Sequence, residues 1–246
     1  MRVMFNNPLV NAKVAQWPAR IVVAVVMGFF VSNAVGQEAA VAESTVAEDT
    51  TVAPDELIRD ATDKIVSAIE QAKKYYDTEP ERFHAAIDEI LFPLIDFRSF
   101  ARGVMGKHGS RRYESTLKDD AAKQVFQARV DAFTEKFKQG LVATYAKGLL
   151  TFQGETIDVL PVGGGIAAGK SVNVVQKIHG DGSEPVLIRY KMRQNTEGLW
   201  KVRNVQLQSI NLGKVYRNQF ASAVRQYNSD IDKVIENWVV ESQDVE

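Results

Sequence analysis

Apolar residues along this chain follow two different spacings, and the change comes near Leu150. Before Leu150 they recur at every third or fourth position, which is the spacing of a helix that buries one face. Turn-forming and polar residues separate these segments from one another. The spacing predicts helices over residues 55–76, 80–91, 97–104 and 126–149.

Short polar sequences mark where two of these helices begin. Residues Thr78 to Glu81 match a capping box, in which the first and last side chains bond to each other's backbone amides, with Pro80 in the first turn. Asp96 precedes the third helix and is of the residue type that caps a helix N-terminus. We therefore expect Thr78 and Asp96 to be N-caps.

Beyond Leu150, apolar and polar residues alternate, as in strands with one buried face. The alternation predicts strands over residues 151–160, 172–178, 186–193 and 199–207, with a hairpin turn at Asp181-Gly182. A last helical region runs from Val215 to Val239 with a break near Asn228. Because helices and strands are segregated along the chain, the expected fold class is α+β. We expect a single domain, with a curved four-stranded antiparallel sheet covered by a helical layer.

The first 36 residues have the layout of a secretory signal peptide. Arg2, Lys13 and Arg20 precede an apolar run over residues 21–31, and small residues follow just before Gln37. The alternative, an uncleaved membrane anchor, needs roughly 20 apolar residues, which is more than this run supplies. We therefore expect a cleaved chain that is exported from the cytoplasm.

The rest of the chain divides into three parts. Residues 37–54 are acidic and lack aromatic side chains, which predicts a flexible tether. Residues 55–240 carry the helix and strand patterns and form the expected domain. Residues 241–246 are a C-terminal tail.

Composition excludes several classes of protein. The 246 residues include no Cys, which excludes disulfide scaffolds, thiol nucleophiles and Cys-ligated metal sites. Lys and Arg number 30 against 31 Asp and Glu, so no overall basic field indicates nucleic acid. Residues 61–246 carry 26 basic and 24 acidic side chains, and this near-neutral balance indicates no funnel for a charged ligand.

One motif matches a nucleotide site. Residues Gly164 to Ser171 fit the pattern of a phosphate-binding loop, which requires a helix directly after it. The residues after Ser171 alternate as a strand instead, so we expect a flexible Gly-rich connection and no nucleotide binding.

Other catalytic and metal-binding patterns are weak. His84, His108 and His179 have no recognisable metal-partner spacing, and acidic pairs such as Asp119-Asp120 lie on polar faces. No serine-nucleophile elbow occurs. We therefore assign no catalytic residue, no metal ligand and no cofactor.

The most unusual feature is the apolar bulk of the helix over residues 126–149. Its aromatic stripe is expected to face the apolar side of the sheet. Two interpretations remain open: the two surfaces pack together as ordinary core, or they leave a ligand cavity between them. Both interpretations predict the same spacing.

Several motifs in a fixed order indicate a family. They are Leu91-Phe92-Pro93-Leu94-Ile95-Asp96, Val104-Met105-Gly106-Lys107, Phe126 to Tyr145, Leu199-Trp200-Lys201-Val202, Ser209-Ile210-Asn211-Leu212 and Tyr216-Arg217-Asn218-Gln219-Phe220. In these motifs, over roughly residues 55–238, the chain resembles the MlaC family of periplasmic phospholipid carriers in the Mla pathway. The family is also called the toluene-tolerance auxiliary proteins. The loops over residues 109–123 and 163–169 look longer than is usual in the family.

The resemblance implies an NTF2-like sheet and a helical layer that hold phospholipid tails in a hydrophobic cavity. It implies a periplasmic protein that passes lipid between an outer-membrane lipoprotein–porin complex and an inner-membrane ABC transporter with an MCE-domain subunit. Such exchange would maintain the lipid asymmetry of the outer membrane. It implies no enzymatic activity, and no nucleotide or nucleic-acid partner.

The residues expected to contact lipid tails are those whose helix or strand phase points between the layers. Strand parity supports the four on the sheet, and the family motif supports Phe133, Phe137 and Tyr145. The full set is Phe97, Phe133, Phe137, Leu141, Tyr145, Val174, Ile188, Tyr190 and Met192.

Two alternative functions remain open at this point. An NTF2-like enzyme acting on a hydrophobic substrate would need a buried acid, for which Asp158 is a candidate. An exported chaperone for lipidated proteins would also need an apolar cavity.

Overall fold

The computed structural model describes residues 52–164, 166–167, 169–180 and 184–240. The expected signal peptide (1–36), the expected tether up to residue 51, the tail (241–246) and the turn at Asp181-Gly182 lie outside the described residues.

Helices form close to where the apolar spacing predicts them. Before the sheet they are α1 (Pro54–Ala72), α2 (Pro80–Leu91), α3 (Phe97–Met105) and α5 (Asp120–Leu149). The polar segment between α3 and α5 forms a 3-10 turn, η2 (Gly106–Gly109), and a short helix, α4 (Arg111–Glu114). After the sheet come α6 (Leu212–Gln226) and α7 (Ile231–Glu236).

The sheet is antiparallel, and its strands lie side by side in chain order. They are β1 (Thr156–Val159), β2 (Ser171–His179), β3 (Val186–Gln194), β4 (Trp200–Leu207) and β5 (Ile210–Asn211). The α+β class is therefore confirmed, but the sheet has five strands and not four. The prediction missed β5 because two residues are too few to show an alternation.

Two local predictions about segment ends are wrong. The strand expected from Thr151 begins at Thr156, because the backbone N–H of Thr151 bonds to Gly148 and extends the end of α5. The capping box does not form: the Thr78 hydroxyl donates to the carbonyl of Tyr75 at 3.1 Å, and Glu79 is the N-cap residue of α2, without a side-chain bond. Thr78 closes the turn after α1 instead of opening α2.

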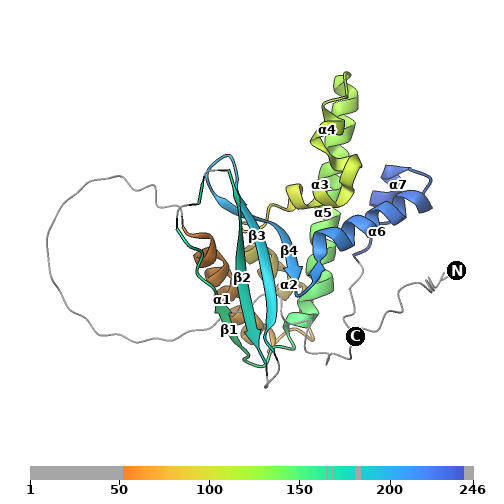
Figure 1. Cartoon of the computed structure of the whole chain (residues 1–246). Coiled ribbons are helices and arrows are strands. Elements are labelled where there is room, and N and C mark those ends of the chain that lie inside the picture. Colours follow the sequence, from red (N-terminus) through yellow and green to blue (C-terminus); the bar gives the residue numbers. More distant parts are fainter. Residues whose placement is uncertain (1–51, 165, 168, 181–183, 241–246) are drawn as a thin grey trace.

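The helical layer is joined to the sheet through the segment before α3. The backbone N–H of Asp96 donates to Val202 at 3.0 Å, and the N–H of Val202 donates to Leu94 at 2.9 Å. Asp96 also caps α3, as predicted, by accepting from the N–H of Ser99 at 2.8 Å. Figure 1 shows α1 beside the sheet on the β1–β2 side, and α3, α5 and α6 grouped at the other end of the molecule.

The aromatic stripe of α5 lies at the centre of the helical layer. The Phe133 ring centroid is 4.9 Å from that of Phe220 and 5.1 Å from that of Trp238. Phe137 lies 5.3 Å from both Phe100 and Tyr216. The ring partners of this stripe thus come from α3, α4, α6 and the segment after α7. The expectation that the stripe faces the sheet is therefore wrong. The spacing of a stripe shows that it is buried but not which layer covers it.

Gly109 provides a test of the packing of η2 against α3, because atoms of α3 occupy the place that a side chain at Gly109 would take. A Cβ atom at Gly109 would lie 2.9 Å from the Arg102 carbonyl oxygen and 2.8 Å from the Met105 Cβ. We expect Gly109→Ala to lower the free energy of unfolding by about 1–3 kcal/mol, the usual cost of overpacking. Denaturant titration measures this cost. Gly163→Ala is the control, since no atom lies within 4 Å of its Cβ position. Equal stability of the two variants would contradict the close approach.

Candidate functional site

The four strand residues expected to face the interior do so. Val174, Ile188, Tyr190 and Met192 share one buried face of β2 and β3 and belong to the main hydrophobic cluster. In the antiparallel register Val174 is opposite Tyr190, which brings the two side chains together. Strand parity was therefore a sufficient guide on this side of the interior.

The helical candidates are also placed in or around the interior, with one exception. Phe133 and Phe137 are fully buried, and Leu141 and Tyr145 are half-buried against the same cluster. Phe97, at the start of α3, is buried but lies outside that cluster. Eight of the nine predicted residues thus share one apolar interior, formed from both layers.

A chain of polar side chains crosses the sheet side of this interior, and the sequence reasoning missed it. The Tyr190 hydroxyl donates to the Gln176 Oε1 at 2.7 Å, and the Gln176 Nε2 donates to the Thr62 Oγ1 at 3.1 Å. Gln176 is completely buried. Strand parity could have found it, because Gln176 lies two residues from both Val174 and Ile178 and therefore on the same face of β2. These hydrogen-bonded side chains attach α1 to the sheet, and their polar groups would be costly to bury without partners.

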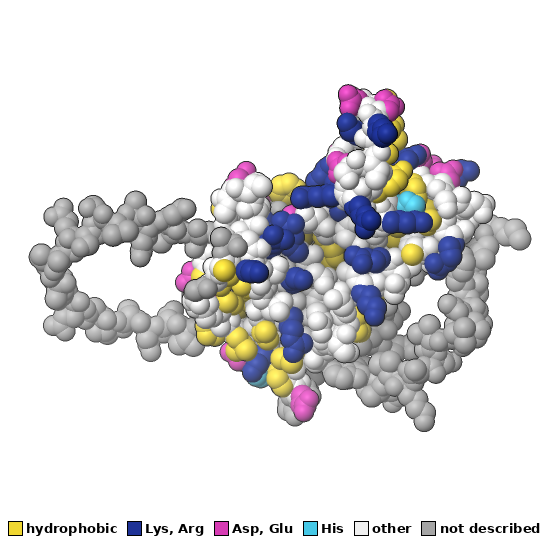
Figure 2. All heavy atoms as spheres, turned by 45° about the horizontal axis from the view of Figure 1, so that its top comes forward, with side chains coloured by type: hydrophobic (Ala, Val, Ile, Leu, Met, Phe, Trp, Pro, Cys, Tyr) yellow, Lys and Arg dark blue, Asp and Glu magenta, His cyan; other side chains and the backbone are white. Residues whose placement is uncertain are grey.

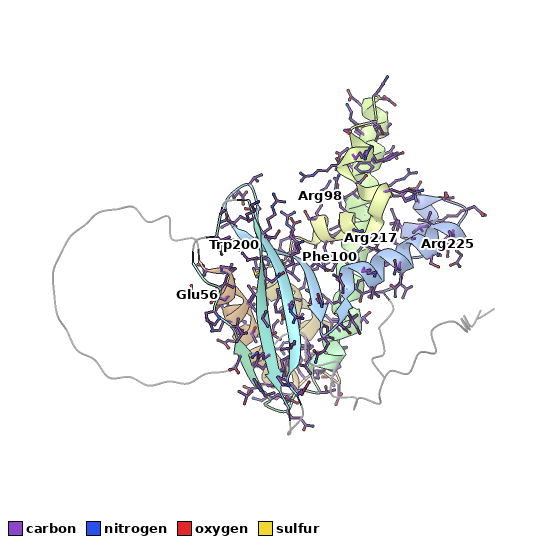
Figure 3. All side chains as sticks on the ribbon, viewed as in Figure 1. Glu56, Arg98, Phe100, Trp200, Arg217 and Arg225 are labelled. Carbon is purple, nitrogen blue, oxygen red and sulfur yellow. The ribbon has the colours of Figure 1, made fainter. Side chains whose placement is uncertain are left out.

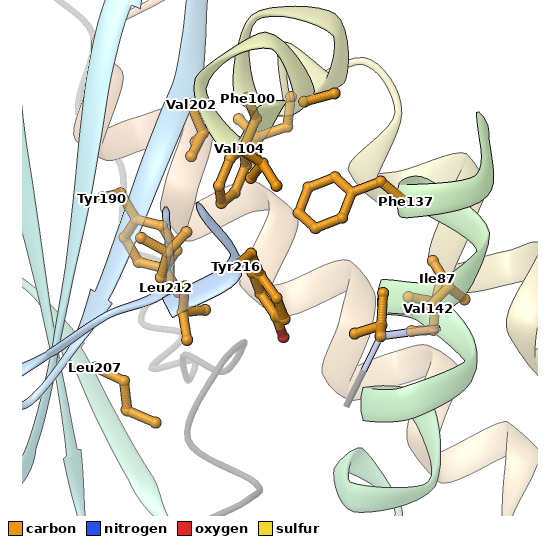
Figure 4. Packing of buried hydrophobic residues seen from close by; sticks show 14 of the residues in the cluster. Ile87, Phe100, Val104, Phe137, Val142, Tyr190, Val202, Leu207, Leu212 and Tyr216 are labelled. Atoms are coloured by element: carbon orange, nitrogen blue, oxygen red, sulfur yellow. The ribbon is translucent and has the colours of Figure 1, made fainter. Parts of the chain in front are cut away.

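A second polar contact joins α5 to α6. The hydroxyls of Tyr145 and Tyr216 are 2.5 Å apart and share a hydrogen bond. Figure 4 shows the Tyr216 ring pointing into the space between Phe137 on α5 and Tyr190 on the sheet. The interior is therefore apolar in its walls but contains tyrosine hydroxyls at defined points.

Burial controls the ionisation of these tyrosines. It raises the pKa of the Tyr190 hydroxyl far above its ordinary value. Burial also raises the pKa of Tyr216, with a further contribution from Tyr145 beside it. Both side chains therefore remain neutral across the physiological range, as an apolar interior requires.

A basic hollow outside the interior is the main feature that the sequence analysis missed. Six basic side chains line a cleft of about 1030 Å³ between α3, η2, the β3–β4 turn and α6. They are Arg102, Lys107, Arg111, Arg193, Arg203 and Arg217. The near-neutral charge balance had indicated no such site. That argument failed because a total charge does not show how the charges are distributed over the surface. The available signal was the polar face of β3 and β4, which carries Lys191, Arg193, Lys201 and Arg203 without an acidic residue.

The candidates for catalysis do not form a buried site. Asp158 on β1 is largely exposed and accepts from the His179 Nε2 at 2.9 Å on the surface. It therefore does not supply the buried acid that an enzyme of this fold would need. In the described segments, no group of three or more His, Asp or Glu side chains is placed to hold a metal ion. Ser171 begins strand β2, so the described part of the Gly-rich motif is followed by a strand, as predicted.

None of the helices in the described part of the chain is both long enough and apolar enough to cross a membrane.

We expect alkaline pH to destabilise the fold through the buried tyrosines. Below about pH 10 their hydroxyls are protonated in both states, so this contribution to stability is fully present. Above that pH the unfolded chain loses the protons while the native interior retains them. The free energy of unfolding then falls by up to about 1.4 kcal/mol per pH unit for each such tyrosine. Denaturant titrations between neutral and alkaline pH measure the slope, which Tyr190→Phe should reduce. An unchanged slope in Tyr190→Phe would contradict the assignment.

Comparisons with known proteins agree with this architecture. The toluene tolerance protein ttg2D of Pseudomonas putida is 30% identical over 197 residues, which are 80% of this chain and 83% of that protein. A solved structure of a phospholipid-binding protein from Ralstonia solanacearum, in complex with a phospholipid, has the same fold, with a TM-score of 0.59 at 20% identity. The match covers 75% of this chain and 96% of that one. A family model described as MlaC protein matches residues 59–239. This chain therefore belongs to the MlaC family.

Proposed function

We propose that this protein is a periplasmic phospholipid carrier without catalytic activity. The observation that carries the proposal is the apolar interior formed by two layers, in a chain that belongs to the MlaC family. The phospholipid bound to the Ralstonia solanacearum protein, which has the same fold, also supports it.

The physical task of such a carrier suits this interior. A two-tailed lipid exposes on the order of 30 methylene groups, and each is worth about 0.8 kcal/mol when it leaves water. Moving the lipid through water unaided therefore costs on the order of 20 kcal/mol. A protein interior that is nearly as apolar as a membrane removes most of this cost, so that loading and unloading stay close to balance.

Residues of both layers would contact the acyl chains. On the sheet these are Val174, Ile188, Tyr190 and Met192. On the helical side they are Phe133, Phe137, Leu141 and Tyr145, with Phe97 at the margin. Since eight of these nine side chains already belong to one packed hydrophobic cluster, the tails must displace contacts within the cluster as they enter.

The carrier would exchange lipid with membrane complexes on both sides of the periplasm. The partners proposed here are an outer-membrane lipoprotein–porin complex and an inner-membrane ABC transporter with an MCE-domain subunit. Such exchange would maintain the lipid asymmetry of the outer membrane. The signal-peptide pattern over residues 1–36 supports the compartment.

The direct test is to express the full precursor, purify the mature protein from the periplasm without detergent, and identify extracted lipids by mass spectrometry. Near-stoichiometric phospholipid is expected. A folded, lipid-free protein would overturn the proposal and favour the alternative of an NTF2-like enzyme acting on a hydrophobic substrate. Recovery of lipidated polypeptides in place of phospholipid would favour the alternative of an exported chaperone for lipidated proteins.

Filling the interior should reduce the amount of bound lipid. We expect Val174→Trp to lower the phospholipid stoichiometry several-fold, because Val174 is fully buried on the interior face of β2. Overpacking costs about 1–3 kcal/mol, so thermal unfolding must accompany the lipid measurement. Leu141→Trp, at a half-buried position, is the second variant if Val174→Trp does not fold. Val175→Trp, on the opposite face of β2, is the matched control. Wild-type loading in both interior variants would show that the tails bind elsewhere.

A further inference from the structure

The proposed function leaves the basic cleft between α3, η2, the β3–β4 turn and α6 unused. A smaller hollow of about 510 Å³ adjoins the larger one, and the two share Ser99, Gly103, Arg193, Arg203 and Arg217. We use the name basic cleft for both hollows together. Figure 2 shows Lys and Arg side chains gathered along this face of the molecule.

The charge in the basic cleft is of one sign. The smaller hollow adds Lys191 and Lys214 to the six basic residues of the larger one. Among the described residues that line the two hollows there is no Asp or Glu. Two of the basic side chains are neutralised from outside: Arg102 pairs with Glu114 at 2.7 Å, and Arg203 pairs with Asp96 at 3.1 Å. The others repel one another across a concave surface, which is unfavourable unless an anion binds there.

Two of the arginines are held in place by the backbone and by neighbouring side chains. The Arg217 Nε donates to the Gly103 carbonyl at 2.7 Å, and the side chain lies against the bare backbone of Gly103 and Gly106. The Arg203 Nη1 donates to the Ser99 hydroxyl at 2.7 Å. Their guanidinium groups therefore lose little conformational freedom when an anion binds.

Some basic groups in the basic cleft have no partner among the described residues. The Arg203 Nε is buried and has no acceptor among the described residues. No carboxylate in the described part of the chain forms a salt bridge with Arg193 or Arg217, although Asp96 lies close enough to pair with Arg203. Guanidinium donors in a fixed fork match the oxygens of a phosphate group and bind it in pairs.

The basic cleft also reaches the apolar interior. Phe100 lines the smaller hollow, and its ring lies 5.3 Å from that of Phe137 in the aromatic cluster. Figure 3 shows Phe100 beside Arg217 near the start of α6. A phosphate in the basic cleft would therefore be one aromatic ring away from the side chains proposed to contact acyl tails.

We infer that the basic cleft binds a phosphate group, either in the head group of the carried lipid or as free phosphate. The lipid source rests on the proposed function, whereas the phosphate site rests on the basic cleft alone. Bound lipid would then lie with its charged end against α3 and α6 and its tails beyond Phe100. Head groups with net negative charge would be held more tightly than zwitterionic ones.

The test compares two double variants by isothermal titration at low salt. Arg193→Gln with Arg217→Gln removes two charges from the basic cleft. Arg189→Gln with Arg225→Gln removes two charges from the same strand and the same helix at positions that do not line it. Figure 3 shows Arg225 at the far end of α6 from Arg217. The probes are inorganic phosphate, glycerophosphoglycerol, which has no tails, and a short-chain phosphatidylglycerol.

We expect the first double variant to weaken binding of the phosphate probes about tenfold or more, and the second to leave it near wild type. If glycerophosphoglycerol and the short-chain lipid bind more tightly than inorganic phosphate, the ligand of the basic cleft is the lipid head group. If inorganic phosphate binds equally well, the ligand is free phosphate. Equal affinities of wild type and the first double variant for every probe would overturn the inference.

The two proposals fail separately. A wild-type protein that carries no lipid but binds glycerophosphoglycerol through Arg193 and Arg217 would remove the carrier function and retain the phosphate site. Lipid-loaded protein with the same head-group composition in wild type and the first double variant, and no phosphate binding, would do the reverse.

Discussion

Two backbone hydrogen bonds between Val202 and the segment before α3 hold the two layers of this protein together. The segment Leu94–Asp96 runs parallel to β4 at Val202 and pairs with it. The two-residue β5 pairs only with Gln206 and Leu207, so Val202 would otherwise present unpaired backbone groups at the sheet edge. The contact therefore pairs the backbone N–H and carbonyl of Val202 at the edge of β4 and fixes the position from which α3 begins.

The other contacts of the helical layer follow from that position. Asp96 caps α3 and binds Arg203, so one carboxylate sets both the helix start and one wall of the basic cleft. With α3 in place, Phe100 reaches Phe137 on α5, and Phe133 packs against Phe220 on α6. The apolar interior and the basic cleft thus depend on the same few residues at the start of α3.

The sequence was informative where a single period decides the outcome. Alternation placed Val174, Tyr190 and Met192 on the interior face, because a strand has only two faces. It could not place Phe133 and Phe137 relative to the sheet, since any helix with a buried stripe has the same spacing whichever layer covers it. The capping box failed because Thr78 lies in the turn after α1, where its hydroxyl donates to the Tyr75 carbonyl, and Glu79 is the N-cap residue of α2.

The basic cleft was missed for a different reason. Its arginines come from α3, α4, β3, β4 and α6, and the strands and helices that carry them meet only through the topology. Net charge averages over the whole surface and is insensitive to such clustering. Gln176 was overlooked because a polar residue interrupts an apolar pattern, although its position in the alternation is that of an interior residue.

Asn211 has a mechanical consequence for how the interior can widen. It is the last residue of β5 and the N-cap of α6, where it accepts from the N–H of Lys214 at 3.0 Å. It also accepts from the Asn204 Nδ2 at 3.0 Å, and the Asn204 Oδ1 accepts from the N–H of Gly213 at 3.0 Å. These hydrogen bonds connect β4 and β5 of the sheet to the start of α6 and fix their relative position. Any parting of α6 from the sheet must therefore begin at positions remote from Asn204 and Asn211.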